Sequence, residues 1–170
     1  VFLDKEKEAT TEMPVYNGNG SINKNIFHSD SKILEINSKS GLYPLYVTYS
    51  IYREKLKNQN KENNILNLEE QLKIWDETIA NNVFVICKSE MAKSITKRTL
   101  IGFRNTKVNT HYFENLTHQI SNRSDKFIEK IQKGQSYWKA NKNNNMKFDA
   151  IVGNPPYQEV NENTSDTPIY

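Results

Sequence analysis

Apolar residues recur along the chain with two spacings, which predict strands that alternate with helices. Three short apolar runs, at residues 32–36, 83–87 and 147–152, are bounded by polar stretches and predict buried strands. A weaker run at about residues 106–110 predicts a further strand. Longer stretches with helical spacing predict helices over residues 41–56 and 68–79, around 91–98, and, as one long helix, over 116–131.

Strands alternating with helices favour parallel βαβ units, and therefore an α/β fold with a doubly wound, mostly parallel sheet and flanking helices. In such sheets, ligands bind beyond the carboxyl ends of the strands, where the strand order reverses. We therefore expect the loops after Ile36, Cys87, Thr110 and Gly153 to lie on one edge. The polar stretches at residues 57–64 and 139–145 predict loops, and residues 1–30 are predicted to be an irregular N-terminal segment with a short amphipathic piece at 22–27.

Composition limits the class of protein more than it defines the function. At 170 residues the chain fits one domain with a real core. A net charge of +3 permits a polyanionic partner without predicting one. The single cysteine, Cys87, excludes an internal disulfide and fits a reducing compartment, so we expect a cytoplasmic protein. No apolar run is long enough to span a membrane, no signal peptide pattern opens the chain, and the histidines and the cysteine lack metal-ligand spacing.

The stretch from Phe148 to Tyr157 carries the most specific chemistry in the sequence. An apolar strand delivers Asn154, Pro155, Pro156 and Tyr157 to a stiff loop. The side-chain carbonyl of Asn154 and the main-chain carbonyl of Pro155 are two acceptors for a planar amino group, and Tyr157 offers a flat ring that suits stacking on a base outside its helix. The simpler interpretation is a proline-rich turn beside a tyrosine, and the preceding strand favours the functional one.

This segment resembles the catalytic motif of S-adenosylmethionine-dependent amino-methyltransferases, especially DNA adenine-N6 methyltransferases of restriction-modification systems of the Eco57I-like type. The resemblance implies that the two acceptors hold the exocyclic amine of a flipped adenine while Tyr157 stacks on it. It also implies a Rossmann-like methyltransferase fold, here with later strands missing. Residues 31–158 would then be a partial catalytic domain and residues 159–170 a truncated C-terminal segment. DNA would be recognised through a region not present in this chain, with a restriction endonuclease domain or subunit as a further partner.

The resemblance extends to the loop that follows the first predicted strand. Glu35 stands at the acidic position that ends this strand in the family, Gly41 matches the last glycine of the loop, and Ser40 matches a small residue. A carboxylate can bind the ammonium group of S-adenosylmethionine, and N–H groups at a helix start can bind its carboxylate. Lys39 replaces an earlier glycine and is the main departure. The predicted cofactor-binding residues in this loop are Glu35, Asn37, Ser38, Lys39, Ser40 and Gly41.

The second and third strands carry weaker matches. Cys87 takes the place of the acidic residue that binds the ribose hydroxyls in the family, and a thiol is a poor substitute. Cys87, Lys88 and Ser89 complete the predicted cofactor site, with Ser89 or Glu90 as the candidate to compensate. After the third strand the usual acid is absent, Tyr112 or Phe113 is the candidate to line an adenine pocket, and His111 is expected to be a loop or partly buried residue. Asp149 receives no chemical role.

Two alternatives remain open at this point. The same loop would hold any planar amine, so methylation of a protein glutamine or of RNA is a second enzymatic interpretation. The departures at Lys39 and Cys87, with the missing third acid, favour instead a non-catalytic module that keeps the fold and has lost cofactor binding.

Overall fold

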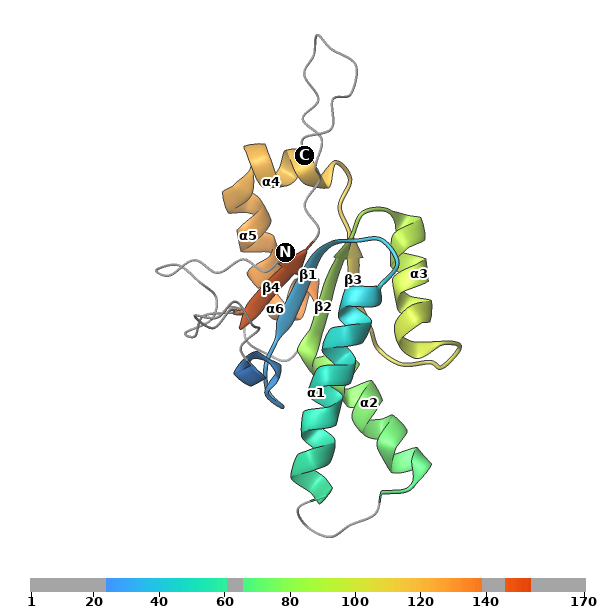
Figure 1. The fold of residues 1–170 in the computed structure, drawn as a ribbon. Helices are drawn as coiled ribbons and strands as arrows, with labels where there is room; N and C mark the ends of the chain where they lie inside the picture. The colour runs from blue at the N-terminus through green and yellow to red at the C-terminus, as the bar shows by residue number, and fades with distance from the viewer. Residues whose placement is uncertain (1–23, 61–65, 139–145, 154–170) are drawn as a thin grey trace, which may run out of the picture.

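A computed structural model describes residues 24–60, 66–138 and 146–153 (Figure 1). Within these ranges, four parallel strands form one sheet in the order β3-β2-β1-β4. Their bounds are Ile33–Ser38 for β1, Val83–Cys87 for β2, Asn109–Tyr112 for β3 and Ala150–Gly153 for β4. The chain therefore has the predicted α/β fold with a parallel sheet, consistent with a Rossmann-like methyltransferase fold.

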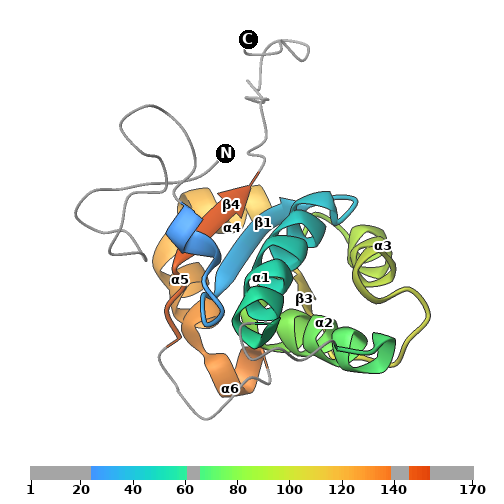
Figure 2. The same cartoon turned by 60° about the horizontal axis from the view of Figure 1, so that its bottom comes forward.

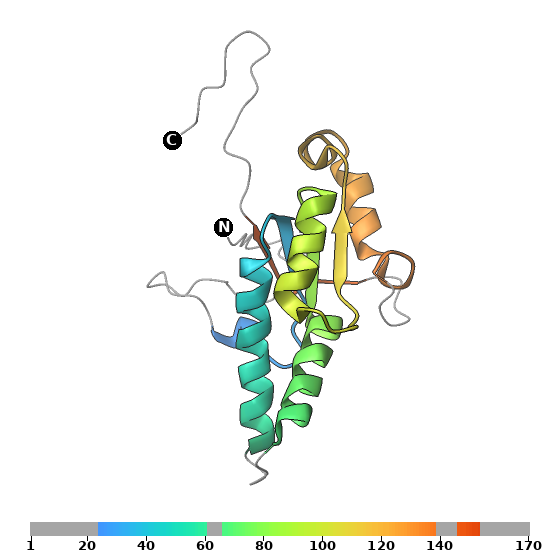
Figure 3. The same ribbon diagram turned by 90° about the vertical axis from the view of Figure 1, so that its right-hand side faces the viewer.

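Helices cover both faces of the sheet, so the molecule has three layers (Figure 3). On one side lie η1 (Lys24–Phe27), α1 (Leu42–Asn60), α2 (Leu68–Asn82) and α3 (Glu90–Ile101). On the other side lie α4 (Leu116–Asn122), α5 (Ser124–Gln132) and α6 (Gly134–Tyr137). No helix in the described ranges has the length and apolar character needed to cross a membrane.

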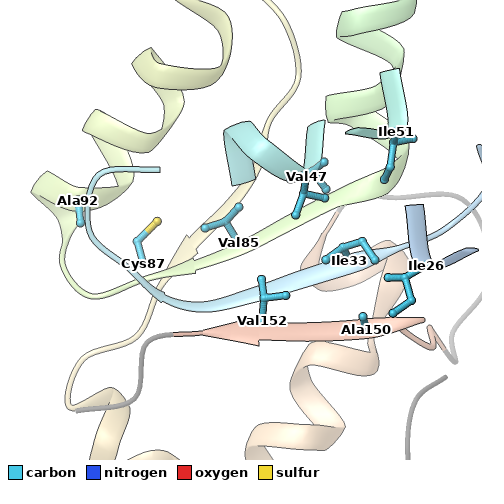
Figure 4. Close-up of a cluster of buried hydrophobic side chains, with 10 residues drawn as sticks. Ile26, Ile33, Val47, Ile51, Val85, Cys87, Ala92, Ala150 and Val152 are labelled. Carbon is cyan, nitrogen blue, oxygen red and sulfur yellow. The ribbon is translucent and has the colours of Figure 1, made fainter. Parts of the chain in front are cut away.

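Successive side chains of β1 point to opposite faces of the sheet and pack in two separate cores. Ile33 packs with Val47 and Ile51 of α1 on one face, in a cluster that Figure 4 shows from the side of the sheet. The next residue, Leu34, points the other way and packs with Trp138 and other aromatic residues beneath α4 to α6. Both faces of the central strands are buried, which explains why the sequence shows continuous apolar runs there rather than alternation.

Local signals in the sequence explain where α2 and α3 begin. Asn67 and Glu70 form a capping box, in which each side chain accepts a hydrogen bond from the other residue's N–H group, at 3.0 and 2.8 Å. The Ser89 hydroxyl accepts from the Ala92 N–H group at the start of α3. The Ser89 cap lets α3 begin at Glu90, three residues after the end of β2 at Cys87.

Several predicted boundaries are wrong. The polar stretch predicted as a loop from residue 57 is helical as far as Asn60, where an ion pair between Lys57 and Glu54 supports the last turns of α1. The strand predicted at residues 106–110 is β3, which begins only at Asn109, and before it the Thr106 hydroxyl donates to Asp76 at 2.6 Å. The strands β1 and β4 extend to Ser38 and Gly153, beyond residues 36 and 152, and β4 begins at residue 150 rather than 147.

The long helix predicted over residues 116–131 is two helices that meet at Arg123. Arg123 has the backbone angles φ −142° and ψ 40°, which belong to neither helix. Leu116 of α4 and Phe127 and Ile131 of α5 pack in the same core. Predicted features at residues 1–21, 61–64, 139–145 and 154–170 lie outside the described residues, and the amphipathic piece at 22–27 contains η1.

Candidate functional site

The strand order reverses between β1 and β4, which lie side by side in the sheet (Figure 2). β1 pairs with β2 on one side and with β4 on the other, so the loops after β1 and β4 leave the sheet at neighbouring points of its carboxyl edge. In open α/β sheets this is where ligands bind. The topology therefore places the ends of β1 and β4, the two strands that precede the loops singled out by sequence analysis, next to each other.

Asp149 fixes the alignment of β4 on β1. The Lys32 N–H group donates to the Asp149 carboxylate at 2.7 Å, and the Asp149 N–H group donates to the Lys32 carbonyl at 2.8 Å. This two-way contact precedes the ladder that pairs Ile33 with Ala150 and ends with Ile36 opposite Gly153. Asp149, to which the sequence assigned no chemical role, thus acts as a structural clamp at the start of the strand.

Gly153 is the last described residue before the predicted catalytic loop, and it lies against the backbone of β1. A Cβ atom at this position would lie 2.9 Å from the Ile36 carbonyl oxygen, closer than real Cβ contacts come. Only glycine permits this approach. Asn154, Pro155, Pro156 and Tyr157 themselves lie outside the described residues, so the structure gives the point from which their loop starts and no more.

The loop after β1 is shaped by residues with left-handed backbone angles. Asn37 has φ 69° and coincides with an irregularity in the pairing of β1 with β2 between Ile36 and Ser38. Beyond it, the Lys88 N–H group donates to the Ser38 carbonyl at 2.8 Å, which ties this loop to the end of β2. Lys39 and Ser40 are exposed at the edge.

Helix α3 supports this loop from the side. Gly41 has φ 78°, and a Cβ atom there would lie 2.9 Å from the Thr96 Cα atom. The Thr96 hydroxyl shares a hydrogen bond with the Ser38 hydroxyl at 3.3 Å, and the Thr99 hydroxyl donates to the Ser40 carbonyl at 2.8 Å. The glycine at this position is therefore required twice, by its backbone angle and by the close packing on α3.

Glu35 is the most unusual group at the site. The sequence placed it at the end of the first strand, whereas it lies inside β1, between Val85 and Val152 of the neighbouring strands, and is only 4 % exposed. Burial raises the pKa of its carboxyl from 4.5 to about 7, against the opposing effect of a hydrogen bond with the Ser38 side chain. Its Oε2 atom has no hydrogen-bond partner among the described residues. A buried carboxylate oxygen without a donor is costly, and such groups concentrate at functional sites.

The residues after β2 have a different character. Cys87 is fully buried in the core below α1 and α3, where Figure 4 shows its thiol. Burial raises its pKa to about 11, so the thiol is neutral and lies 3.8 Å from the Thr96 hydroxyl. Ser89 is exposed, but its hydroxyl caps α3. Of the predicted cofactor residues at the end of β2, Lys88 and Ser89 lie at the surface just after the strand, and Cys87 is buried.

An aromatic cluster follows the end of β3. His111 is half-buried, as predicted, and stacks on Tyr137 with a centroid distance of 3.9 Å. Phe113 is buried against Phe127, whereas Tyr112 is half-buried. Of the two candidates for an adenine pocket, Phe113 is thus committed to the core and Tyr112 is the more accessible.

Sequence analysis missed Asp149, Thr96 and Thr99, although all three shape the site. The only available signal for Asp149 was its place directly before a strong apolar strand, and a polar residue at a strand start is common. The two threonines lie on α3, and the spacing of residues along a helix does not show that they contact a loop distant in the sequence.

A comparison with protein families gives a match to the model of the Eco57I restriction-modification methylase over residues 81–170, just over half of the chain. The chain belongs to this family. The region that matches the Eco57I methylase family runs from the end of α2 through β4 and includes Asn154 to Tyr157, while β1 and its loop precede it. Membership indicates a DNA methyltransferase of a restriction-modification system. No curated protein and no solved structure gives a significant match.

Proposed function

We propose that this protein transfers a methyl group from S-adenosylmethionine to the N6 atom of an adenine that has been flipped out of duplex DNA. The observation that carries the proposal is the pairing of β1 with β4, which sets Gly153 opposite Ile36. A loop that starts at Asn154 therefore begins beside the loop that runs from Asn37 to Gly41. The methyl donor and the acceptor amine would enter from the same edge.

The residues around β1 fit the amino-acid end of the cofactor. Glu35 supplies a carboxyl group whose Oε2 atom has no hydrogen-bond partner among the described residues, which suits an ammonium group. The first turn of α1 follows Gly41 directly and contains no acidic residue, so its N–H groups remain suited to a carboxylate. When bound, S-adenosylmethionine supplies a methyl group already activated by its sulfonium charge. The chain's residues then have to bind and orient rather than activate.

The proposed roles on the acceptor side follow from the chemistry of the loop residues. Asn154 and the Pro155 carbonyl would accept hydrogen bonds from the exocyclic amine and direct its lone pair towards the methyl group. Pro156 would keep the loop stiff, and Tyr157 would stack on the flipped base. Residues 31–158 would form part of the catalytic domain, in a cytoplasmic enzyme that recognises DNA through a further region and works with a restriction endonuclease domain or subunit.

A second candidate function is a non-catalytic module with the same fold. It is favoured by Cys87, because a buried neutral thiol offers nothing to the ribose hydroxyls at the position where the family has an acid. Lys39 adds to this interpretation, since an exposed cation beside the loop would oppose the positive sulfonium. Lys88 and Ser89 are the remaining surface residues just after β2 that could meet the ribose.

Two measurements test these proposals. Calorimetric titration with S-adenosylmethionine separates an enzyme, which binds it saturably, from a module, which does not bind it at millimolar concentration. Methyl transfer to adenine-containing duplexes is then compared between the wild type and Asn154→Ala. The variant is expected to lose most of its activity while it keeps its affinity for the cofactor. Equal activity of the two proteins would contradict the role of Asn154, and transfer to a glutamine peptide or RNA in preference to DNA would contradict the substrate.

A further inference from the structure

Lys126 and Lys130 of α5 and Lys133, which directly follows its last residue, are three neighbouring lysines, and we call them the α5 basic stripe. With the helical rotation of about 100° per residue continued to Lys133, they fall within an arc of about 60°. All three are exposed, while Phe127 and Ile131 on the adjoining side are buried in the core. The stripe is therefore held on the outer surface by the same packing that fixes the helix.

The stripe borders a shallow groove of about 430 Å³, lined by the three lysines, Glu129 and Tyr137. The Lys130 ammonium lies 4.7 Å from the centre of the Phe113 ring and 5.7 Å from that of Tyr137, and these contacts hold it low in the groove. Lys133 pairs with Glu129 at 2.8 Å. Three cations and one anion leave the groove with a net positive charge.

Glu129, three residues from Lys126 and four from Lys133, offsets only part of the positive charge of the stripe. Lys126 and Lys130 are four residues apart and Lys130 and Lys133 are three apart, and such pairs repel on a helix surface. With one carboxylate for three ammonium groups, the groove keeps an excess of positive charge. An anionic partner lying across the stripe would relieve the repulsion.

The position of α5 indicates which anion this is. Helix α4 lies at the end of the sheet where β4 ends, and α5 leads away from there along the face opposite α1 to α3 (Figure 1). From Lys126 to Lys133 the stripe spans about 10 Å at the helical rise of about 1.5 Å per residue. We propose that the α5 basic stripe contacts phosphates of duplex DNA next to the base that is methylated, which rests on the proposed function. Lysines serve as point charges for phosphates and position a duplex without reading its sequence.

A pair of double variants tests this contact. Lys126→Gln with Lys133→Gln removes two charges from the stripe and leaves Lys130 on its rings. The matched control, Lys93→Gln with Lys97→Gln, removes two exposed or half-exposed lysines from α3 on the opposite layer, where Lys93 pairs with Glu90 at 3.3 Å much as Lys133 pairs with Glu129. Fluorescence anisotropy with a labelled duplex measures affinity over a range of salt concentrations.

The stripe variant is expected to bind DNA about tenfold more weakly at low salt, and the slope of log affinity against log salt is expected to fall by about 2, one for each phosphate contact. The α3 control is expected to stay within about twofold of the wild type with an unchanged slope. Equal losses in both variants, an unchanged slope in the stripe variant, or no DNA binding by the wild type would overturn the proposal. Calorimetry with S-adenosylmethionine on the same proteins reports separately on the proposed function, because neither variant touches Glu35 or its loop.

Discussion

Replacing Glu35 with glutamine should make the protein more stable, and more so as the pH rises. The buried carboxyl has a pKa of about 7 instead of 4.5, so between these values the folded state holds a proton that the unfolded state has lost. Wild-type stability therefore falls as the pH rises through this window and levels off above about 7. At about 1.4 kcal/mol for each pH unit, the loss amounts to about 3 kcal/mol at pH 8. A glutamine side chain does not ionise, so Glu35→Gln avoids this loss of stability.

Urea unfolding at pH 4, 6 and 8 measures the effect. The gain in unfolding free energy of Glu35→Gln over the wild type should be near zero at pH 4 and approach about 3 kcal/mol at pH 8. Glu114→Gln is the control, since this glutamate is exposed and lies outside the helices and strands, and it should change stability by less than about 0.5 kcal/mol at each pH. If the unfolding free energies of wild type and Glu35→Gln changed with pH in parallel, the reasoning would be refuted. In the proposed function, the more stable variant should also bind S-adenosylmethionine more weakly.

Three further predictions concern the carboxyl edge of the sheet and the core beside it. Gly153→Ala places a Cβ atom against the Ile36 carbonyl and should cost about 1–3 kcal/mol in urea unfolding; an unchanged midpoint would mean that β4 can shift freely. Asp149→Ala removes the acceptor of the Lys32 N–H group and should cost about 1 kcal/mol, whereas Asp149→Asn keeps an oxygen there and should cost less; equal losses would count against the clamp. Cys87 should resist alkylation by iodoacetamide at pH 8 in the folded protein, because burial keeps the thiol neutral and covered. It should react once urea unfolds the protein. Rapid labelling of the folded chain would contradict the position of Cys87 in the core.

Sequence patterns predicted the strands and most helices because the signal for each is local. The run Val83–Cys87 is apolar throughout and is buried throughout, so periodicity and structure agree. No local signal predicts the break at Arg123, since the apolar spacing continues across it and both short helices pack in one core. No local pattern predicts the bulge at Asn37 either, although asparagine tolerates the left-handed angle better than most residues.

The candidate site was predictable only in its parts. The sequence singled out Glu35 and Gly41 on one strand and loop, and residues 154–157 on another. The neighbouring position of the two strands comes from pairing between distant segments. That Gly41 lies against Thr96, and that Cys87 lies in the core, depends on how α3 packs, which no local pattern specifies.

The clamp between Lys32 and Asp149 joins positions 117 residues apart in the chain. Closing so long a loop costs conformational entropy before any contact compensates for it, and folding slows as contacts become less local. Within the described sheet β4 pairs with β1 alone, whereas β1 and β2 each have two neighbours. We therefore expect β4 to join last during folding and to open first in native-state hydrogen exchange. The acceptor side of the edge would then assemble, and come apart, independently of the strands that hold Glu35.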